Sequence, residues 1–182
     1  MQKFRWAYLG CGDIAQITAK ELSDGEIVAV WNRTPERAQE FVKKFGGIVY
    51  ETAEEAITAP GVEGVYIAVT ANLHADYMKL CIKHHKPVLC EKPFTVNAKQ
   101  AQAIFAYAAQ EGVYVSEAMW TWHNATACKV KDWITSEAVN KKSKLYLFLS
   151  NDQILEKAAT LSGRIDCRRF VGHWCLLYPL LL

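Results

Sequence analysis

The chain has 182 residues, 51% of them hydrophobic, which is enough for one packed domain of ordinary size and a remainder. Its net charge is only +2 and its basic residues are scattered, so we expect a small-molecule partner, no nucleic acid and no membrane. The six cysteines form no C-x-x-C pair, which indicates reduced thiols and no metal site. Without a signal peptide or an apolar run near roughly 20 residues, the predicted location is cytoplasmic.

The chain begins with a strand, a glycine-rich turn and a helix. Residues 4–9 form an apolar run, residues 10–15 read G-x-G-x-x-A, and apolar residues then recur at helical spacing to Leu22. Such a turn lets a dinucleotide pyrophosphate approach the backbone and the N-terminus of the helix. The predicted cofactor contacts here are Gly10, Cys11, Gly12, Asp13 and Ile14. A glycine-rich turn that binds nothing is the alternative.

The turn after the second predicted strand, residues 26–31, bears on the choice of cofactor. NAD-binding sites usually offer an acidic residue about 20 positions beyond the glycines. Here the chain has Asn32, Arg33 and Thr34, and the planar cation of Arg33 suits the 2′-phosphate of NADP. These three residues are predicted cofactor contacts, with NADP favoured and NAD as the alternative. Thr34 is also predicted to cap the next helix, with Pro35 at its first position.

Strand-like and helical segments alternate from there to residue 117. The predicted strands are 48–50, 65–69, 87–90 and 113–117. Four helices are predicted alongside them: one that ends near Phe45, a brief one that begins at the capping-box spacing of Thr52 and Glu55, one that ends near His84, and one from Asn97 to Gln110. In the helix before His84, the expected buried stripe is Leu73, Tyr77, Leu80 and Cys81. This alternation predicts an α/β fold with a doubly wound parallel sheet of the Rossmann type.

Polar residues follow the fourth and fifth predicted strands. A parallel sheet binds its ligand outside the carboxyl ends of its strands, so these residues are placed to meet one. His74 could face such a cleft, or it could be a surface histidine with one local hydrogen bond. The run Glu91-Lys92-Pro93 could likewise be a solvated strand end followed by a turn.

Four motifs together resemble the Gfo/Idh/MocA oxidoreductase family over about residues 3–138. They are the glycine turn at 10–15, Asn72-Leu73-His74, Cys90-Glu91-Lys92-Pro93 and Ser116-Glu117-Ala118-Met119-Trp120. The last is most similar to the dihydrodiol dehydrogenase and NADP-dependent sugar dehydrogenase branch, although Trp122 replaces an arginine usual there. The resemblance implies NAD(P)-dependent hydride transfer to or from a sugar, polyol or related alcohol.

The same resemblance implies roles for single residues. In this family the lysine of the E-K-P motif projects toward the nicotinamide and the substrate hydroxyl, and the Lys-Pro bond is often cis. Lys92 is therefore the implied catalytic residue, because a positioned amine can relay a proton or stabilise an alkoxide. The implied cofactor contacts beyond the first two turns are Thr70, Asn72, His74 and Glu91.

The resemblance fades beyond Asn140. The family continues into a large, mostly antiparallel sheet that forms the substrate pocket and usually the homo-oligomer interface, and residues 141–182 are too few for it. We therefore predict an NAD(P)-binding domain over residues 1–120. Residues 121–182 are predicted to be a truncated or out-of-frame remnant of the second α+β domain, with helices at 124–137 and 152–159 and a strand at 144–150. A non-catalytic dinucleotide-binding module, or an inactive remnant, is the alternative function.

Overall fold

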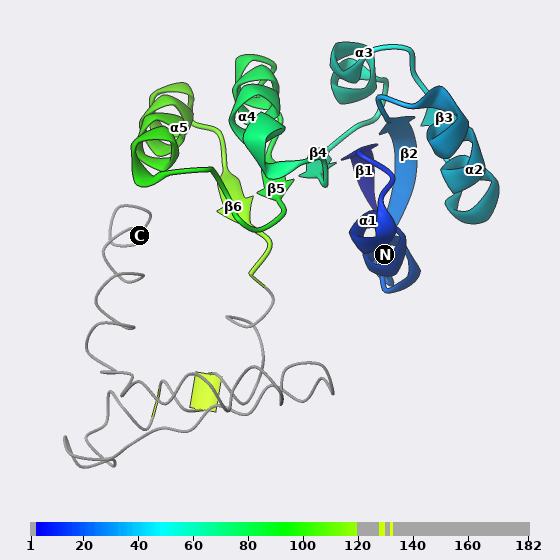
Figure 1. Ribbon diagram of the computed structural model, residues 1–182, viewed down its shortest axis with the longest axis horizontal. Coiled ribbons are helices and arrows are strands. Elements are labelled where there is room, and N and C mark those ends of the chain that lie inside the picture. The colour runs from blue at the N-terminus through cyan, green and yellow to red at the C-terminus, as the bar shows by residue number, and fades with distance from the viewer. Residues whose placement is uncertain (1–2, 120–127, 130–131, 133–182) are drawn as a thin grey trace. The chain divides into compact units, whose positions relative to one another are not determined.

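A computed structural model describes residues 3–119, 128–129 and 132, and the chain divides into two units, Met1–His123 and Asn124–Leu182. The first unit contains a parallel sheet with the strand order β3-β2-β1-β4-β5-β6 (Figure 1). The strands are β1 (Phe4–Leu9), β2 (Gly25–Trp31), β3 (Ile48–Val49), β4 (Gly64–Ile67), β5 (Val88–Cys90) and β6 (Val115–Glu117). The predicted doubly wound sheet is confirmed.

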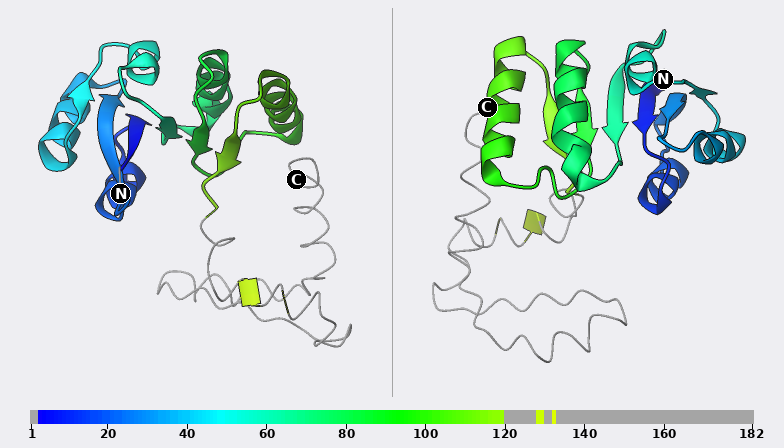
Figure 2. Two further views of the ribbon diagram at one scale, coloured as in Figure 1. Left: turned by 180° about the vertical axis from the view of Figure 1, so that it is seen from behind. Right: turned by 45° about the horizontal axis from the view of Figure 1, so that its top comes forward.

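Helices cover the sheet from both sides. They are α1 (Asp13–Lys20), α2 (Pro35–Phe45), α3 (Ala53–Thr58), the 3₁₀ turn η1 (Ala71–Leu73), α4 (His74–Lys83) and α5 (Ala98–Glu111). Buried residues of α1 and α2 form one apolar cluster with the sheet, and those of α3, α4 and α5 form another. The helices α4 and α5 lie side by side (Figure 2). The two clusters show that each helix group packs on its own face of the sheet.

The central strands are buried on both faces. Tyr8 and Tyr66 pack on the α1 and α2 side, with ring centroids 4.8 Å apart, whereas Leu9 and Ile67 belong to the cluster on the opposite side. Successive side chains of a strand point to opposite faces, so each strand needs apolar residues at nearly every position. This is why the strands appear in the sequence as continuous apolar runs.

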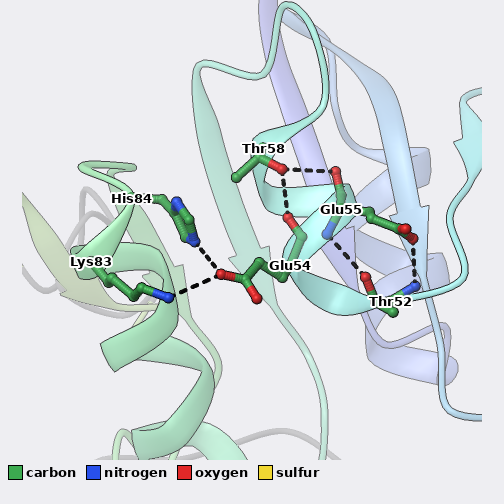
Figure 3. Close-up of polar contacts among 6 residues, drawn as sticks. All are labelled: Thr52, Glu54, Glu55, Thr58, Lys83 and His84. Atoms are coloured by element: carbon green, nitrogen blue, oxygen red, sulfur yellow. Dashed lines mark hydrogen bonds and ion pairs between the residues drawn. The ribbon is translucent and has the colours of Figure 1, made fainter.

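Side chains stabilise the starts of two helices as predicted. The Thr52 N–H donates to Glu55 Oε2 at 3.0 Å, and the Glu55 N–H donates to Thr52 Oγ1 at 3.2 Å (Figure 3). This reciprocal pair confirms the capping box at the start of α3. At α5 the Gln100 N–H donates to Asn97 Oδ1 at 2.9 Å, and Gly112 ends the helix with φ +65°.

The start of α2 differs from the prediction. Thr34 occupies the capping position and Pro35 the first helical position, but the Thr34 hydroxyl makes no capping hydrogen bond. The N–H of Arg37, which a capping hydroxyl would normally bind, instead donates to the Thr34 carbonyl oxygen at 3.1 Å. The predicted positions of Thr34 and Pro35 are therefore confirmed, whereas the side-chain hydrogen bond expected of the cap is absent, and the Thr34 hydroxyl has no partner among residues 3–119.

A surface cluster connects α3 with the end of α4. Lys83 Nζ and His84 Nε2 both donate to Glu54 Oε1, at 3.1 and 2.6 Å (Figure 3). The hydrogen bond from His84, and then that from Lys83, lower the pKa of the Glu54 carboxyl. Because Glu54 lies in solvent, the cluster contributes little to stability.

The buried face of α4 shares only Cys81 with the predicted stripe. The buried residues of this helix are His74, Ala75, Met78, Cys81 and Ile82, whereas Leu73, Tyr77 and Leu80 are only partly buried. The 3₁₀ turn η1 precedes α4, the regular helix begins at His74, and His74 lies in the protein interior.

The remaining expectations fall mainly outside the described residues. Cys128, Lys129 and Asp132 are helical, while the rest of the predicted helix at 124–137, the strand at 144–150, the helix at 152–159 and Trp122 are not among the described residues. The domain boundary near residue 120 stays a prediction. Within the described part of the chain, no helix combines the length and apolar character needed to cross a membrane.

Candidate functional site

The glycine turn lies where the strand order reverses. The chain adds β2 and β3 on one side of β1, and β4, β5 and β6 on the other. In such sheets, ligands bind beyond the carboxyl ends of the strands at this point. Gly10 has φ +98°, and a Cβ on it would lie 2.5 Å from the Ala68 carbonyl oxygen. Only glycine fits this close approach between the ends of β1 and β4.

The second glycine leaves its side of the turn open. Gly12 precedes α1, and a Cβ there would meet no atom within 4 Å. The first hydrogen bond of the helix runs from the Gln16 N–H to the Gly12 carbonyl oxygen, so the N–H groups of Asp13 and Ile14 have no partner within the helix. These groups and the helix dipole favour a bound anion. The backbone at residues 12–14 therefore fits a pyrophosphate.

A cavity of about 340 Å³ adjoins this turn. It is lined by Cys11, Gly12, Asp13, Gln16, Arg37, Glu40, Phe41 and Lys44. Arg37 was not predicted as a site residue, although its place in the first turn after Arg33 could have indicated it. The cavity joins the glycine turn to α2, which contributes the cations Arg37 and Lys44 to its lining.

Asn32 braces the glycine turn against the end of β2. Its Oδ1 accepts from the Cys11 N–H at 3.1 Å, and its Nδ2 donates to the Thr34 carbonyl oxygen at 2.9 Å. The Cys11 side chain is only 5% exposed, and burial raises the pKa of its thiol to about 12. Cys11 thus shapes the turn through its backbone, with a neutral thiol turned into the core.

Arg33 is exposed after β2, and no hydrogen bond or ion pair to a described residue engages its guanidinium. Its charge acts on Tyr77, because it partly opposes the burial that raises the pKa of this phenol. Tyr77 packs against Trp31, with ring centroids 5.3 Å apart. An available cation therefore lies near an aromatic pair at the carboxyl end of β2.

The loop after β4 supplies further exposed polar groups. Thr70 and Asn72 are exposed, and their side chains make no hydrogen bond within residues 3–119. The Thr70 carbonyl oxygen accepts from the Leu73 N–H at 2.9 Å, which begins η1. The backbone of the loop is thus fixed while both side chains stay available to a ligand.

His74 is 1% exposed, and both of its ring nitrogens face carbonyl oxygens. Nδ1 lies 2.9 Å from the Pro93 oxygen and Nε2 lies 3.0 Å from the Val69 oxygen. The predicted direct contact with a cofactor has no ring nitrogen left to make it. The alternative, a surface histidine with one local hydrogen bond, is wrong.

Glu91 is 9% exposed, so a solvated strand end does not describe it. Its Oε1 accepts from the Tyr66 hydroxyl at 2.8 Å, and its Oε2 accepts from the Lys92 N–H at 3.1 Å. Burial is the main cause that raises the pKa of Tyr66, so the phenol keeps its proton and remains a donor. The Tyr66 hydroxyl also lies 2.9 Å from Thr18 Oγ1 of α1. Glu91 thus fixes the backbone that precedes Lys92.

Lys92 itself is exposed, and its amine has no hydrogen bond or ion pair with the described residues. The Lys92-Pro93 bond is cis, as the resemblance implies. The next residue is also held, because the Phe94 N–H donates to Glu117 Oε1 at 2.8 Å. Glu117 was noticed in the sequence only as part of a motif and not as a residue of the site.

The comparison with known families agrees with this geometry. Residues 4–119 match the Gfo/Idh/MocA model, described as an oxidoreductase family with an NAD-binding Rossmann fold. The chain belongs to the Gfo/Idh/MocA oxidoreductase family. Since the matched segment carries the glycine turn and the E-K-P motif, this family member has the NAD(P)-binding part of the fold.

Relatives named as enzymes are similar over between 64% and 92% of this chain. Mouse trans-1,2-dihydrobenzene-1,2-diol dehydrogenase is 37% identical over 123 residues, which cover 64% of this chain and 37% of the relative. D-xylose 1-dehydrogenase (NADP⁺) of Hypocrea jecorina is 30% identical, covering 92% of this chain and 47% of the relative. A 3-ketoreductase of Actinomadura kijaniata, solved with NADP and TDP-benzene, matches with TM-score 0.68 and 28% identity, covering 76% of this chain and 44% of that one. This Gfo/Idh/MocA chain therefore spans less than half the length of these relatives.

Proposed function

We propose that this Gfo/Idh/MocA chain binds NADP and acts in hydride transfer to or from a sugar, polyol or related alcohol, with Lys92 as the catalytic residue. The observation that carries the proposal is the exposed Lys92 amine, on a backbone held by Glu91, at the same edge of the sheet as the open glycine turn. Relatives named as NADP⁺ enzymes of xylose and scyllo-inositol support the cofactor and the substrate class.

The proposed cofactor contacts divide by chemistry. The backbone at Gly10, Gly12 and the first turn of α1 receives the pyrophosphate, for which Gly12 leaves space. Arg33, with Arg37 beside the cavity, receives the 2′-phosphate, because a guanidinium binds phosphate through two parallel hydrogen bonds. The polar side chains available for the ribose and nicotinamide are those of Thr34, Thr70 and Asn72.

In the proposed reaction, the Lys92 side chain exchanges a proton with the substrate oxygen. When bound, NADP⁺ would accept the hydride and NADPH would supply it. In alcohol oxidation the Lys92 amine takes the hydroxyl proton, and in carbonyl reduction the ammonium returns it to the oxygen. Because the amine has no partner within residues 3–119, no described carboxylate competes with the substrate oxygen for it. Glu91 contributes by fixing the Lys92 backbone.

Arg33→Ala tests the cofactor assignment. Titration of the wild-type chain with NADPH, followed by Trp fluorescence, should saturate, since Trp31 lies close to the site. Loss of a charge-assisted contact worth about 1.5–3 kcal/mol should weaken NADPH binding roughly tenfold to a hundredfold. NADH binding should change less than about threefold, because NADH lacks the 2′-phosphate.

The control for this experiment is Lys43→Ala, which removes an exposed cation of α2 that does not line the cavity. Equal weakening of NADPH and NADH by Arg33→Ala would remove the NADP assignment. Absence of any saturable fluorescence change in the wild-type chain would remove cofactor binding altogether.

Lys92→Ala tests the catalytic assignment. With a panel of aldoses and polyols, turnover should fall by at least about a hundredfold, because general acid–base groups contribute roughly 10²–10⁴ in rate. NADPH binding should persist within about threefold, since Lys92 is not assigned to the phosphates. The control, Lys99→Ala, removes another exposed lysine, at the start of α5. Saturable NADPH binding without wild-type turnover would favour the alternative, a dinucleotide-binding module without catalysis.

A further inference from the structure

Side chains hold the backbone around Lys92 at three successive residues. Glu91 Oε2 accepts from the Lys92 N–H, His74 Nδ1 lies 2.9 Å from the Pro93 carbonyl oxygen, and Glu117 Oε1 accepts from the Phe94 N–H. None of these contacts belongs to a strand ladder or a helix. The turn that presents Lys92 is therefore shaped by side chains.

These side chains connect the turn to several elements of the sheet. His74 begins α4 and also faces the Val69 carbonyl oxygen just after β4. Glu117 ends β6, and its neighbour Ala118 donates its N–H to the Cys90 carbonyl oxygen at 2.7 Å. The Lys92 turn is thus attached to the two neighbours of β5 in the sheet, and its position follows theirs.

The two ring nitrogens of His74 face two carbonyl oxygens, and each of these oxygens needs a hydrogen-bond donor. A carbonyl oxygen only accepts, so each contact is a hydrogen bond only where the facing nitrogen carries a proton. The imidazolium satisfies both contacts, and a neutral ring satisfies one. The oxygens of Val69 and Pro93 accept no other hydrogen bond within residues 3–119. An apolar side chain at position 74 would leave both without a donor, which costs free energy in a buried site.

We propose that His74 and Glu117 are positioning residues, which hold the Lys92 turn so that the Lys92 amine meets the cofactor. The inference rests on the proposed function, because it gives Lys92 the catalytic role. It assigns His74 a different task from the direct cofactor contact expected from the sequence. Lys92 depends on this support because its own side chain has no partner among the described residues.

Amide hydrogen exchange, measured by NMR without cofactor, tests the hold on the turn. In His74→Phe and Glu117→Leu, exchange of the Lys92 or Phe94 amide should accelerate at least about tenfold. Glu117→Gln keeps an acceptor oxygen for the Phe94 N–H and should exchange like wild type. His84→Phe is the matched control, since His84 follows the same helix and, among the described residues, its ring hydrogen-bonds Glu54 and not the Lys92 turn. Unchanged exchange in both disruptive variants would overturn the proposal.

A second measurement tests the consequence for Lys92. After reductive ¹³C-methylation, the Lys92 signal is identified by its loss in Lys92→Arg, and saturating NADP⁺ should shift it in the wild-type chain. His74→Phe and Glu117→Leu should lose more than half of this shift while NADPH affinity stays within about threefold. Glu117→Gln should retain it. Thermal unfolding checks each variant, and if His74→Phe does not fold, the Glu117 pair decides.

The outcomes separate the inference from the proposed function. In one outcome, amide exchange is faster in the variants but NADP⁺ does not shift the Lys92 signal of the wild-type chain. This outcome would refute the placement of Lys92 at the cofactor and with it the proposed function. A wild-type shift that both disruptive variants keep in full would refute the positioning roles of His74 and Glu117 and leave the proposed function intact.

Discussion

Gly10→Ala is expected to lower the free energy of unfolding by at least about 3 kcal/mol, since it combines two costs. The backbone at Gly10 has φ +98°, a conformation that residues other than glycine rarely adopt. The added Cβ would also lie 2.5 Å from the oxygen and 2.7 Å from the carbon of the Ala68 carbonyl. Both atoms belong to backbone beside the central strands, so neither can move without disturbing the sheet. Urea denaturation followed by circular dichroism measures the loss.

Gly12→Ala is the matched control, with the opposite expectation. Gly12 has φ −72°, which alanine adopts freely, and its Cβ would enter open space. Stability should stay within about 0.5 kcal/mol of wild type. If a pyrophosphate approaches this backbone, the methyl group should weaken NADPH binding by about tenfold or more. Equal stability of the two variants, or undiminished NADPH binding by Gly12→Ala, would contradict the assigned roles.

Alkaline solution should unfold the domain, because its core holds protons that the unfolded chain releases. Burial raises the pKa of Tyr8 and of Cys11 to about 12, and raises the pKa values of the groups in Tyr66, Cys81 and Cys90 further. The ordinary pKa is 9.0 for these thiols and 10.0 for the phenols. Since each folded pKa lies above the unfolded one, the stabilisation is complete below pH 9 and is lost as the pH rises toward the folded values.

The magnitude of this effect follows from the number of retained protons. Each contributes about 1.4 kcal/mol per pH unit, so the three thiols alone give a slope of about 4 kcal/mol per pH unit above pH 9. Urea denaturation at several pH values between 8 and 11 measures it. Cys81→Ala should reduce the slope by one proton. A constant free energy of unfolding up to pH 10.5 would show that the folded state does not keep these thiols protonated.

The sequence predicted well the features that depend on neighbouring residues. The strand at residues 4–9, the glycine turn and the capping box of Thr52 and Glu55 each arise within a few positions. Arg33 could be predicted in the same way, because the sequence alone shows a cation directly after the second strand. All of these are local patterns in which backbone geometry follows from residue type.

The contacts of His74 and Glu91 could not be predicted in this way. The Pro93 oxygen that His74 faces lies 19 positions along the chain, and the Tyr66 hydroxyl lies 25 positions from Glu91. Tyr66 meets this part of the chain only because β4 pairs with β5, with Tyr66 opposite Leu89. The charge of Glu91 suggested exposure to a ligand, whereas the fold gives it a buried phenol as a partner. Arg37 was missed because only the cavity joins it to the glycine turn.

The central place of β1 has a consequence for how the domain forms during synthesis. The first strand to leave the ribosome pairs with β2 and β4, and Ala7 of β1 lies opposite Val65 of β4. One edge of β1 therefore stays unpaired until more than a third of the chain has been made. Pairing across such a separation makes folding slow compared with helical domains. During that interval the unpaired edge of β1 presents backbone N–H and C=O groups with which other nascent chains can pair.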